Sequence, residues 1–144
     1  MAPMTARVWL GRALIGLVLF FNAQAALWFM RFPAQFAPQF GLAGPLGDAV
    51  VRAIGILFLM WTVPYFVAVS NPVRQRVSLF EAIAMQAIGL LGESLLLARF
   101  PAGYPQVEAS ILRFMAFDGG GLLALVLAAA VTWPRRVTHP AGAA

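Results

Sequence analysis

The chain of 144 residues contains no cysteine, no lysine and a single histidine. Without cysteine it forms no disulfide, uses no thiol in catalysis, and ligates neither an iron–sulfur cluster nor a thioether-attached haem. The one histidine, His139, lies five residues before the last residue and follows Pro134, which excludes a bis-histidine haem inside a membrane and a histidine-rich metal site. We therefore expect no metal site and no cofactor.

Charge is also scarce. Charged residues make up 10% of the chain and hydrophobic residues 62%, whereas soluble domains are about half apolar and a quarter charged. This balance predicts that the chain lies in a lipid bilayer. The net charge of +5 then indicates arginines in loops and not a surface for nucleic acid.

Long apolar stretches are what the sequence does contain. Each is long enough for the ~20 residues that cross a hydrocarbon core, and the four cover 8–30, 46–70, 77–100 and 109–133. Short connections rich in proline and glycine separate them and leave no room for another domain. The sequence predicts one membrane domain over 1–144, an all-α bundle of four transmembrane helices, with a disordered tail at 134–144.

The first stretch also resembles a secretory signal peptide. Arg7 and Arg12 precede an apolar run, and Ala23-Gln24-Ala25 resembles a cleavage site. The apolar stretch continues beyond that site, however, and cleavage would remove one of four spans from a chain whose halves match. We therefore expect the first span to be retained.

The arginines indicate an orientation. Two, Arg31 and Arg99, flank one side of the predicted bundle, and six fall on the other: Arg7, Arg12, Arg74, Arg76, Arg135 and Arg136. By the positive-inside rule both termini face the cytoplasm. Because arginine in place of lysine is typical of a GC-rich, bacterial coding sequence, we expect a bacterial inner membrane.

The tetrapeptide Arg-Phe-Pro-Ala occurs twice, at 31–34 and at 99–102. In each copy the arginine reaches the headgroups and the proline stops the helix, so each copy should end the first helix of a hairpin. Arg52 and Arg113 take similar positions in the second helices. The sequence predicts two repeated helical hairpins. The alternative stays open that Arg-aromatic-Pro is simply a favourable way to leave a membrane.

Polar residues inside the spans are the candidate functional groups, because a charge near the bilayer centre costs ~2.5–3.5 kcal/mol without a partner or a cavity. Helical spacing puts Gln86 and Glu93 on one face, and glycines leave the backbone around Asp118 bare. We predict an inward-facing cluster in the outer half of the bilayer, with Arg52 between the carboxylates of Glu93 and Asp118. Its candidate members are Arg52, Glu93, Asp118, Asn22 and Gln86.

Two roles are open for these residues. Internal ion pairs could fix the register of the bundle, and Asp48 with Arg52 is a self-contained i, i+4 pair of this kind. Buried carboxylates in membranes are otherwise candidates for function. Arg113 lies 140° from Asp118 around an ideal helix and is expected to extend outward.

No catalytic residues are predicted. The serines have no histidine to activate them, and Gly119-Gly120-Gly121 lies within a helix with no lysine after it, unlike a phosphate-binding loop. An enzyme is therefore the less favoured class.

The second span begins VVRAIGILFL after the loop FPAQFAPQFGL, and the last helix is rich in glycine. With four short spans, this pattern resembles the DoxX-like group of small bacterial membrane proteins. The resemblance implies a four-helix bundle, and some members of the group are linked with quinone-dependent sulfur oxidation or other membrane redox complexes. No catalytic motif of such a complex is matched, and the absence of cysteine argues against sulfur redox chemistry by this chain.

Three functions are compatible with these features. The sequence favours a non-enzymatic partner or stabilising subunit for other membrane proteins. The second hypothesis is a binding or transport module, in which Arg52, Glu93 and Asp118 line an outward-facing pocket for a small polar or amphiphilic ligand; transport would imply a homodimer. The third, a subunit of a quinone-linked oxidoreductase, follows from the resemblance alone.

Overall fold

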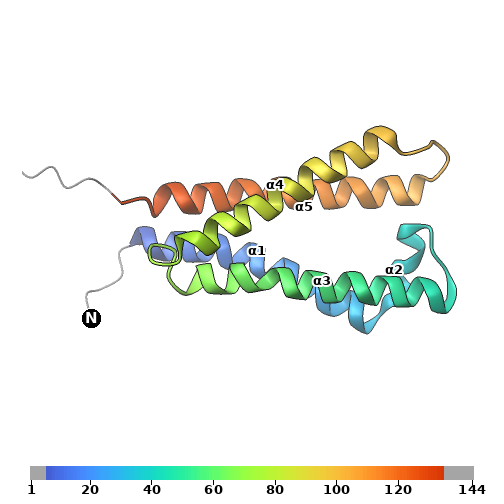
Figure 1. Cartoon of the computed structure of the whole chain (residues 1–144), viewed down its shortest axis with the longest axis horizontal. Coiled ribbons are helices and arrows are strands. Elements are labelled where there is room, and N and C mark those ends of the chain that lie inside the picture. Colours follow the sequence, from blue (N-terminus) through green and yellow to red (C-terminus); the bar gives the residue numbers. More distant parts are fainter. Residues whose placement is uncertain (1–5, 135–144) are drawn as a thin grey trace, which may run out of the picture.

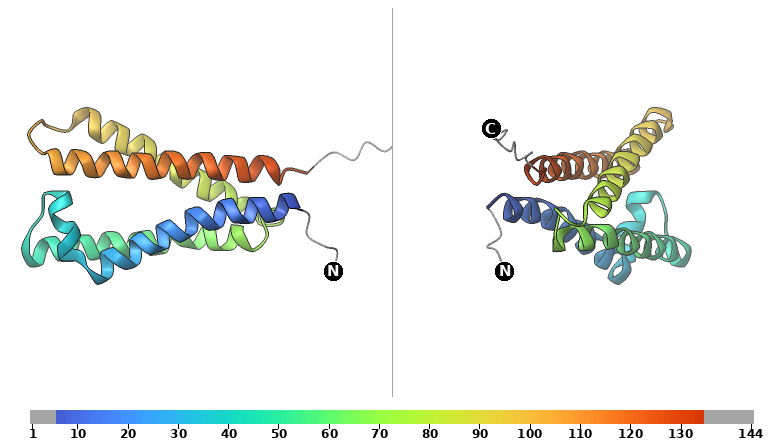
Figure 2. Two further views of the ribbon diagram at one scale, coloured as in Figure 1. Left: turned by 180° about the vertical axis from the view of Figure 1, so that it is seen from behind. Right: turned by 60° about the vertical axis from the view of Figure 1, so that its left-hand side comes forward.

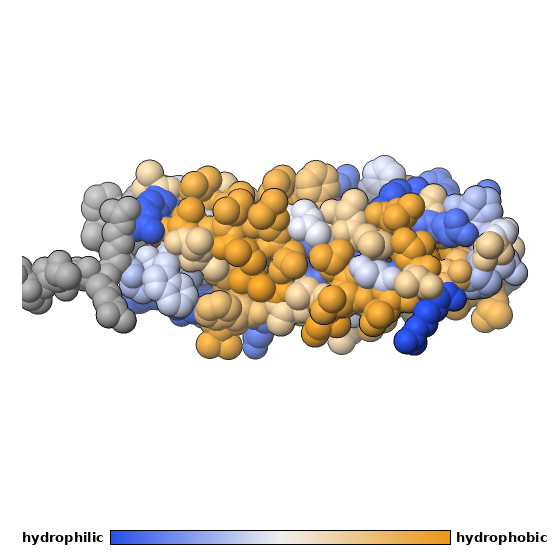
Figure 3. Space-filling view, turned by 90° about the horizontal axis from the view of Figure 1, so that it is seen from above, coloured by the Kyte–Doolittle hydropathy of each residue, from blue (hydrophilic) through white to orange (hydrophobic). Residues whose placement is uncertain are grey.

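The computed structural model describes residues 6–134, and all secondary structure in this range is helical. Four helices are long and apolar enough to cross a membrane: α1 (Ala6–Arg31), α3 (Gly44–Ser70), α4 (Arg76–Arg99) and α5 (Pro105–Val131). Apolar residues form a broad band between more hydrophilic ends (Figure 3). The prediction of an all-α, four-span membrane bundle is confirmed. Arg135, Arg136, His139 and the predicted tail beyond Pro134 lie outside the described residues.

Both copies of Arg-Phe-Pro-Ala end a long helix, as predicted. The last residue of α1 is Arg31 and the last residue of α4 is Arg99. After the first copy the chain forms two short helices that the sequence analysis did not anticipate, α2 (Pro33–Phe36) and the 3₁₀ turn η1 (Ala37–Phe40). Each carries proline in its first turn, where the missing N–H group costs nothing. Duplication of the two hairpins stays a prediction.

The long helices form two pairs of antiparallel neighbours, α1 with α3 and α4 with α5 (Figure 1). Within the first pair the two backbones approach each other closely at Gly55. A Cβ atom there would lie 2.8 Å from the backbone oxygen of Ala26 and 3.1 Å from the backbone nitrogen of Met30. Small residues are the usual means of bringing two helix backbones together in a membrane.

One end of the bundle, here called the amino end, contains the start of α1 and the α3–α4 connection. All four long helices contribute to its core, which consists of Ile15, Val18, Tyr65, Ala68, Leu79, Ala82, Leu125 and Ala128. Arg76 of α4 donates a hydrogen bond from Nη2 to the backbone oxygen of Thr132 at 3.2 Å and lies over the ring of Trp133. These contacts hold α4 tightly against α5 at this end.

The opposite end, here called the α2 end, has a different core. Phe29, Ala37 and Val51 are buried there, and Phe58 and Phe114 pack against them. None of the α4 residues described here belongs to this cluster. The buried residues of α4 stop at Gln86, and from there the helix diverges from α3 (Figures 1 and 2).

Two glycine substitutions test this packing. Gly55→Ala should lower the stability of the purified protein by about 1–3 kcal/mol, because the new methyl group meets the backbone of α1. Gly92→Ala is the matched control, since nothing lies within 4 Å of a Cβ atom there, and it should be neutral or stabilising by up to about 1 kcal/mol. Thermal unfolding in mild detergent measures both. Equal effects of the two substitutions would contradict the close approach of α1 and α3.

Candidate functional site: a polar cavity beside the diverging half of α4

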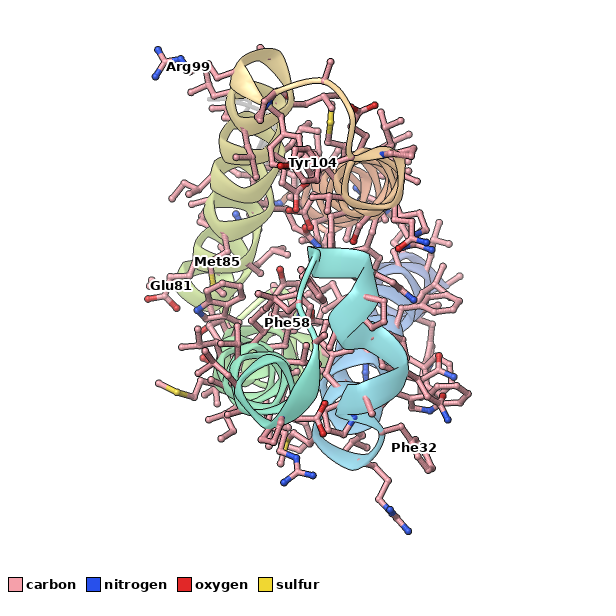
Figure 4. The ribbon with its side chains drawn as sticks, turned by 90° about the vertical axis from the view of Figure 1, so that its right-hand side faces the viewer. Phe32, Phe58, Glu81, Met85, Arg99 and Tyr104 are labelled. Carbon is pink, nitrogen blue, oxygen red and sulfur yellow. The ribbon has the colours of Figure 1, made fainter. Side chains whose placement is uncertain are left out.

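A cavity of about 420 Å³ lies where α4 diverges from the bundle. We call it the polar cavity. The view from the α2 end shows Phe58 in the interior between the helices, with Met85 toward it, whereas Glu81 and Arg99 point away from the bundle (Figure 4). All four long helices contribute to the lining of the polar cavity, which consists of Asn22, Phe58, Trp61, Tyr65, Met85, Gln86, Ile88, Gly89, Glu93, Phe114, Phe117 and Asp118.

Four of the five residues predicted to cluster line this cavity: Asn22, Gln86, Glu93 and Asp118. Asn22 belongs to the buried stripe of α1, and its Nδ2 donates a long hydrogen bond of 3.4 Å to the backbone oxygen of Phe58. Gln86 is only 3% exposed, yet its amide forms no hydrogen bond with another described residue. The Oε2 atom of Glu93 is buried and has no hydrogen-bond partner either.

The fifth predicted member is misplaced. Arg52 is exposed on the surface of α3 and forms no ion pair with Asp48, Glu93 or Asp118. The expectation that it lies between two carboxylates, and the expected i, i+4 pair with Asp48, are therefore wrong. The physical reason is the phase of the helix. Because α3 approaches α1 closely at Gly55, the helix face that carries Gly55 and the fully buried Val51, four residues before it, is turned toward α1. Arg52 follows Val51 by one residue and therefore lies about 100° away around the helix axis.

The other arginine near this depth also avoids the polar cavity. Arg113 is exposed and donates a hydrogen bond from Nη2 to Oε1 of Gln39 at 2.8 Å, as its angular distance from Asp118 predicted. Among residues 6–134, no arginine or histidine lines the polar cavity. Its two carboxylates therefore face a space without a positively charged side chain.

Two glycines hold the polar side chains in place. A Cβ atom at Gly89 of α4 would overlap the carboxylate of Asp118 on α5, and a Cβ atom at Gly121 of α5 would lie 2.5 Å from Nε2 of Gln86 on α4. Gln86 and Gly89 are three residues apart on α4, and their partners Gly121 and Asp118 are three residues apart on α5 in the opposite direction. The two contacts therefore belong to one antiparallel register. We call them the reciprocal glycine contacts. Gly121 belongs to the glycine run noted above in the last span, but its pairing with Gln86 and that of Gly89 with Asp118 were not predicted.

The sequence did not predict the aromatic wall of the cavity. Phe58, Trp61 and Tyr65 follow one another at i, i+3 and i+7 on α3, and Phe114 and Phe117 are spaced by three on α5. This spacing places each group on one helix face. The Tyr65 hydroxyl donates a hydrogen bond to the backbone oxygen of Ala82 at 3.5 Å. One sequence signal indicates part of the wall, since Phe114 precedes Asp118 by four residues and so lies on the same helix face.

Two residues that line the cavity are exposed on the outside of the bundle, Trp61 of α3 at 46% and Ile88 of α4 at 69%. Both belong to helices that are long and apolar enough to span a membrane, so the cavity has lining residues on the lipid-facing surface.

A second hollow of about 320 Å³ lies beside the first, between α1 and α5. Its lining includes Trp28 and Arg113. The side chains common to both hollows are Asn22, Phe58, Phe114 and Phe117. Arg113 lines this second hollow and not the polar cavity.

Comparisons with protein-family models, with curated proteins and with solved structures found no match to this chain.

A double-mutant cycle tests the contact between Asp118 and Gly89. Gly89→Ala should destabilise the wild-type protein, because the added methyl group displaces the Asp118 carboxylate. In an Asp118→Ala background the same change should be neutral or slightly stabilising. Thermal unfolding of the four proteins should give a coupling energy of about 1–2 kcal/mol. An equal loss in both backgrounds would place the Asp118 side chain elsewhere.

Proposed function

We propose that this protein is a membrane binding module that takes a small amphiphilic molecule from the bilayer into the polar cavity. The observation that supports the proposal is the set of unpaired polar groups in a hollow of ligand size. Gln86 and the Oε2 atom of Glu93 are buried without hydrogen bonds to described residues. Burial of an unpaired polar group costs several kcal/mol, and a ligand that bonds to these groups removes that cost.

The alternative of a purely structural cluster has less support. Structural ion pairs need a cation beside each carboxylate, and the described arginines near this depth, Arg52 and Arg113, point elsewhere. The rest of the lining also fits a ligand site, since such sites combine apolar and aromatic walls with a few convergent polar groups. Ionisable residues inside a span commonly mark a site of this kind.

A partner or stabilising subunit, which the sequence favoured, stays a prediction with no specific contact to support it. A subunit of a quinone-linked oxidoreductase rests on the proposed likeness to the DoxX-like group. No residue on this chain is proposed as catalytic. In both cases the polar cavity would be the place to look for a small molecule.

We further propose that the protein lies in a bacterial inner membrane with both termini in the cytoplasm. Arg74 and Arg76 lie at the same end of the bundle as the start of α1, and Arg31 and Arg99 lie at the other (Figure 1). The sequence adds Arg135 and Arg136 after the last helix. This excess of arginine at the amino end supports the orientation.

Native mass spectrometry of the protein in mild detergent tests the binding proposal. Wild type should carry a small molecule that Glu93→Gln and Asp118→Asn both lose. The matched controls Glu81→Gln and Asp48→Asn remove the same charges outside the cavity and should keep it. All four variants should stay folded, because no described ion pair is broken. An empty wild type whose Glu93 and Asp118 variants unfold readily would instead make the carboxylates structural.

The orientation is tested by cysteine labelling, for which a chain without cysteine is well suited. Ala102→Cys in the α4–α5 connection and Gln75→Cys in the α3–α4 connection are both at exposed positions. A membrane-impermeant maleimide added to intact spheroplasts should label Ala102→Cys only. Labelling of Gln75→Cys should require permeabilised membranes. The reverse pattern would put the termini on the outer side.

A further inference from the structure

The polar cavity has a definite electrostatic character, and each helix around it contributes. The titratable groups that face it are Tyr65 from α3, Glu93 from α4 and Asp118 from α5, and α1 adds the uncharged Asn22. The Asp118 carboxylate lies against Gly89, and Glu93 follows Gly89 by four residues on the same face of α4. When both carboxylates are ionised the cavity carries two negative charges with no described cation among its lining residues.

The aromatic rings around these carboxylates add to the attraction for positive charge. Phe58 lies at the centre of the wall, 5.6 Å from Trp61 and 6.0 Å from Phe114 between ring centroids. The faces of such rings attract organic cations, and aromatic cages for quaternary ammonium groups are built in this way. Trp61 lines the cavity and is 46% exposed, so its ring is accessible from the surface of the bundle.

Buried amides make this a built site and not only an acidic cluster. Gln86 is 97% buried, lines the cavity and lacks a hydrogen bond to any described residue. It is held by its contact with Gly121. Asn22 is 7% exposed and leaves its Oδ1 atom without a hydrogen bond to a described group. These groups offer oxygen acceptors beside the carboxylates, which suits a ligand with positive charge or N–H donors.

We propose that the ligand of this cavity is a lipophilic organic cation, which binds in competition with protons at Glu93 and Asp118. The inference rests on the binding module proposed above and specifies its ligand. An anion would be repelled by the carboxylates. A neutral amphiphile would leave two adjacent carboxylates without a counter-charge. A cation with an apolar body supplies the charge and fills the aromatic part of the cavity.

Proton competition follows from the same geometry. A proton on Glu93 or Asp118 removes the negative charge that attracts the cation, and a bound cation in turn opposes protonation. By linkage each reduces the affinity for the other. Binding of the cation should therefore weaken as the pH falls.

The test uses three probes of similar shape with the wild-type protein in lipid nanodiscs. Tetraphenylphosphonium is the cation, tetraphenylborate the anion and triphenylphosphine oxide the neutral probe, and empty nanodiscs correct for partition into lipid. Equilibrium dialysis at pH 8 should show saturable binding of the phosphonium ion, tighter than binding of either other probe by about tenfold or more. At pH 5 its affinity should fall by about tenfold or more.

Variants assign the effect to the cavity. Glu93→Gln with Asp118→Asn should abolish the preference for the cation and its pH dependence. Glu81→Gln with Asp48→Asn, which lie outside the cavity, should leave both unchanged. If the double cavity variant fails to fold, the pH series on wild type decides alone.

The outcomes separate this inference from the proposed function. Equal binding of all three probes, or tighter binding of the neutral one, would overturn the cation inference and leave the binding module standing. If none of the three probes binds, the cation inference is also overturned. The binding-module proposal would then rest on the co-purified molecule that native mass spectrometry tests for. Binding of the phosphonium ion that does not respond to pH would overturn the competition with protons.

Discussion

The reciprocal glycine contacts between α4 and α5 determine where the molecule is closed and where it is open. On the amino-end side of these contacts, α4 buries Leu79 and Ala82 against the other helices. Beyond them no residue of α4 that the structure describes is classed as buried. Because Asp118 and Gln86 are inserted between the two helices at this level, polar groups occupy the point from which α4 diverges. The cavity is the space left beside that point.

The α2 end stays packed without α4 because the connection after α1 folds back on the bundle. The rings of Phe36 and Phe40 pack against Phe29 at centroid distances of 4.8 Å and 5.9 Å. Phe40 also meets Phe114 of α5 at 6.0 Å. These contacts close the α2 end without a contribution from α4. The α4–α5 connection contains no helix, and this difference between the hairpins leaves one side of the bundle open.

The sequence predicts the fold well because its signals are local. A long apolar run predicts a span, and Arg31 and Arg99 mark helix ends whatever the packing. The site was predicted only in part, because helix phase depends on which face meets a neighbour. The helical period alone does not decide whether Val51 or Arg52 faces the interior of the bundle. The contact of Gly55 with α1 decides that Val51 does. A contact between helices of this kind has no signature in the period of a single helix.

Asp118 carries out two tasks that pull in different directions. Its carboxylate occupies the space where a Cβ atom at Gly89 would lie, although glycine lowers helix stability by about 0.5–1 kcal/mol relative to alanine. The same carboxylate faces the cavity without an ion pair to any described residue, which costs further free energy in a membrane. Apolar residues at both positions would give a more stable helix pair. The binding of a small molecule, as proposed above, would offset the cost of this combination, which packing alone does not.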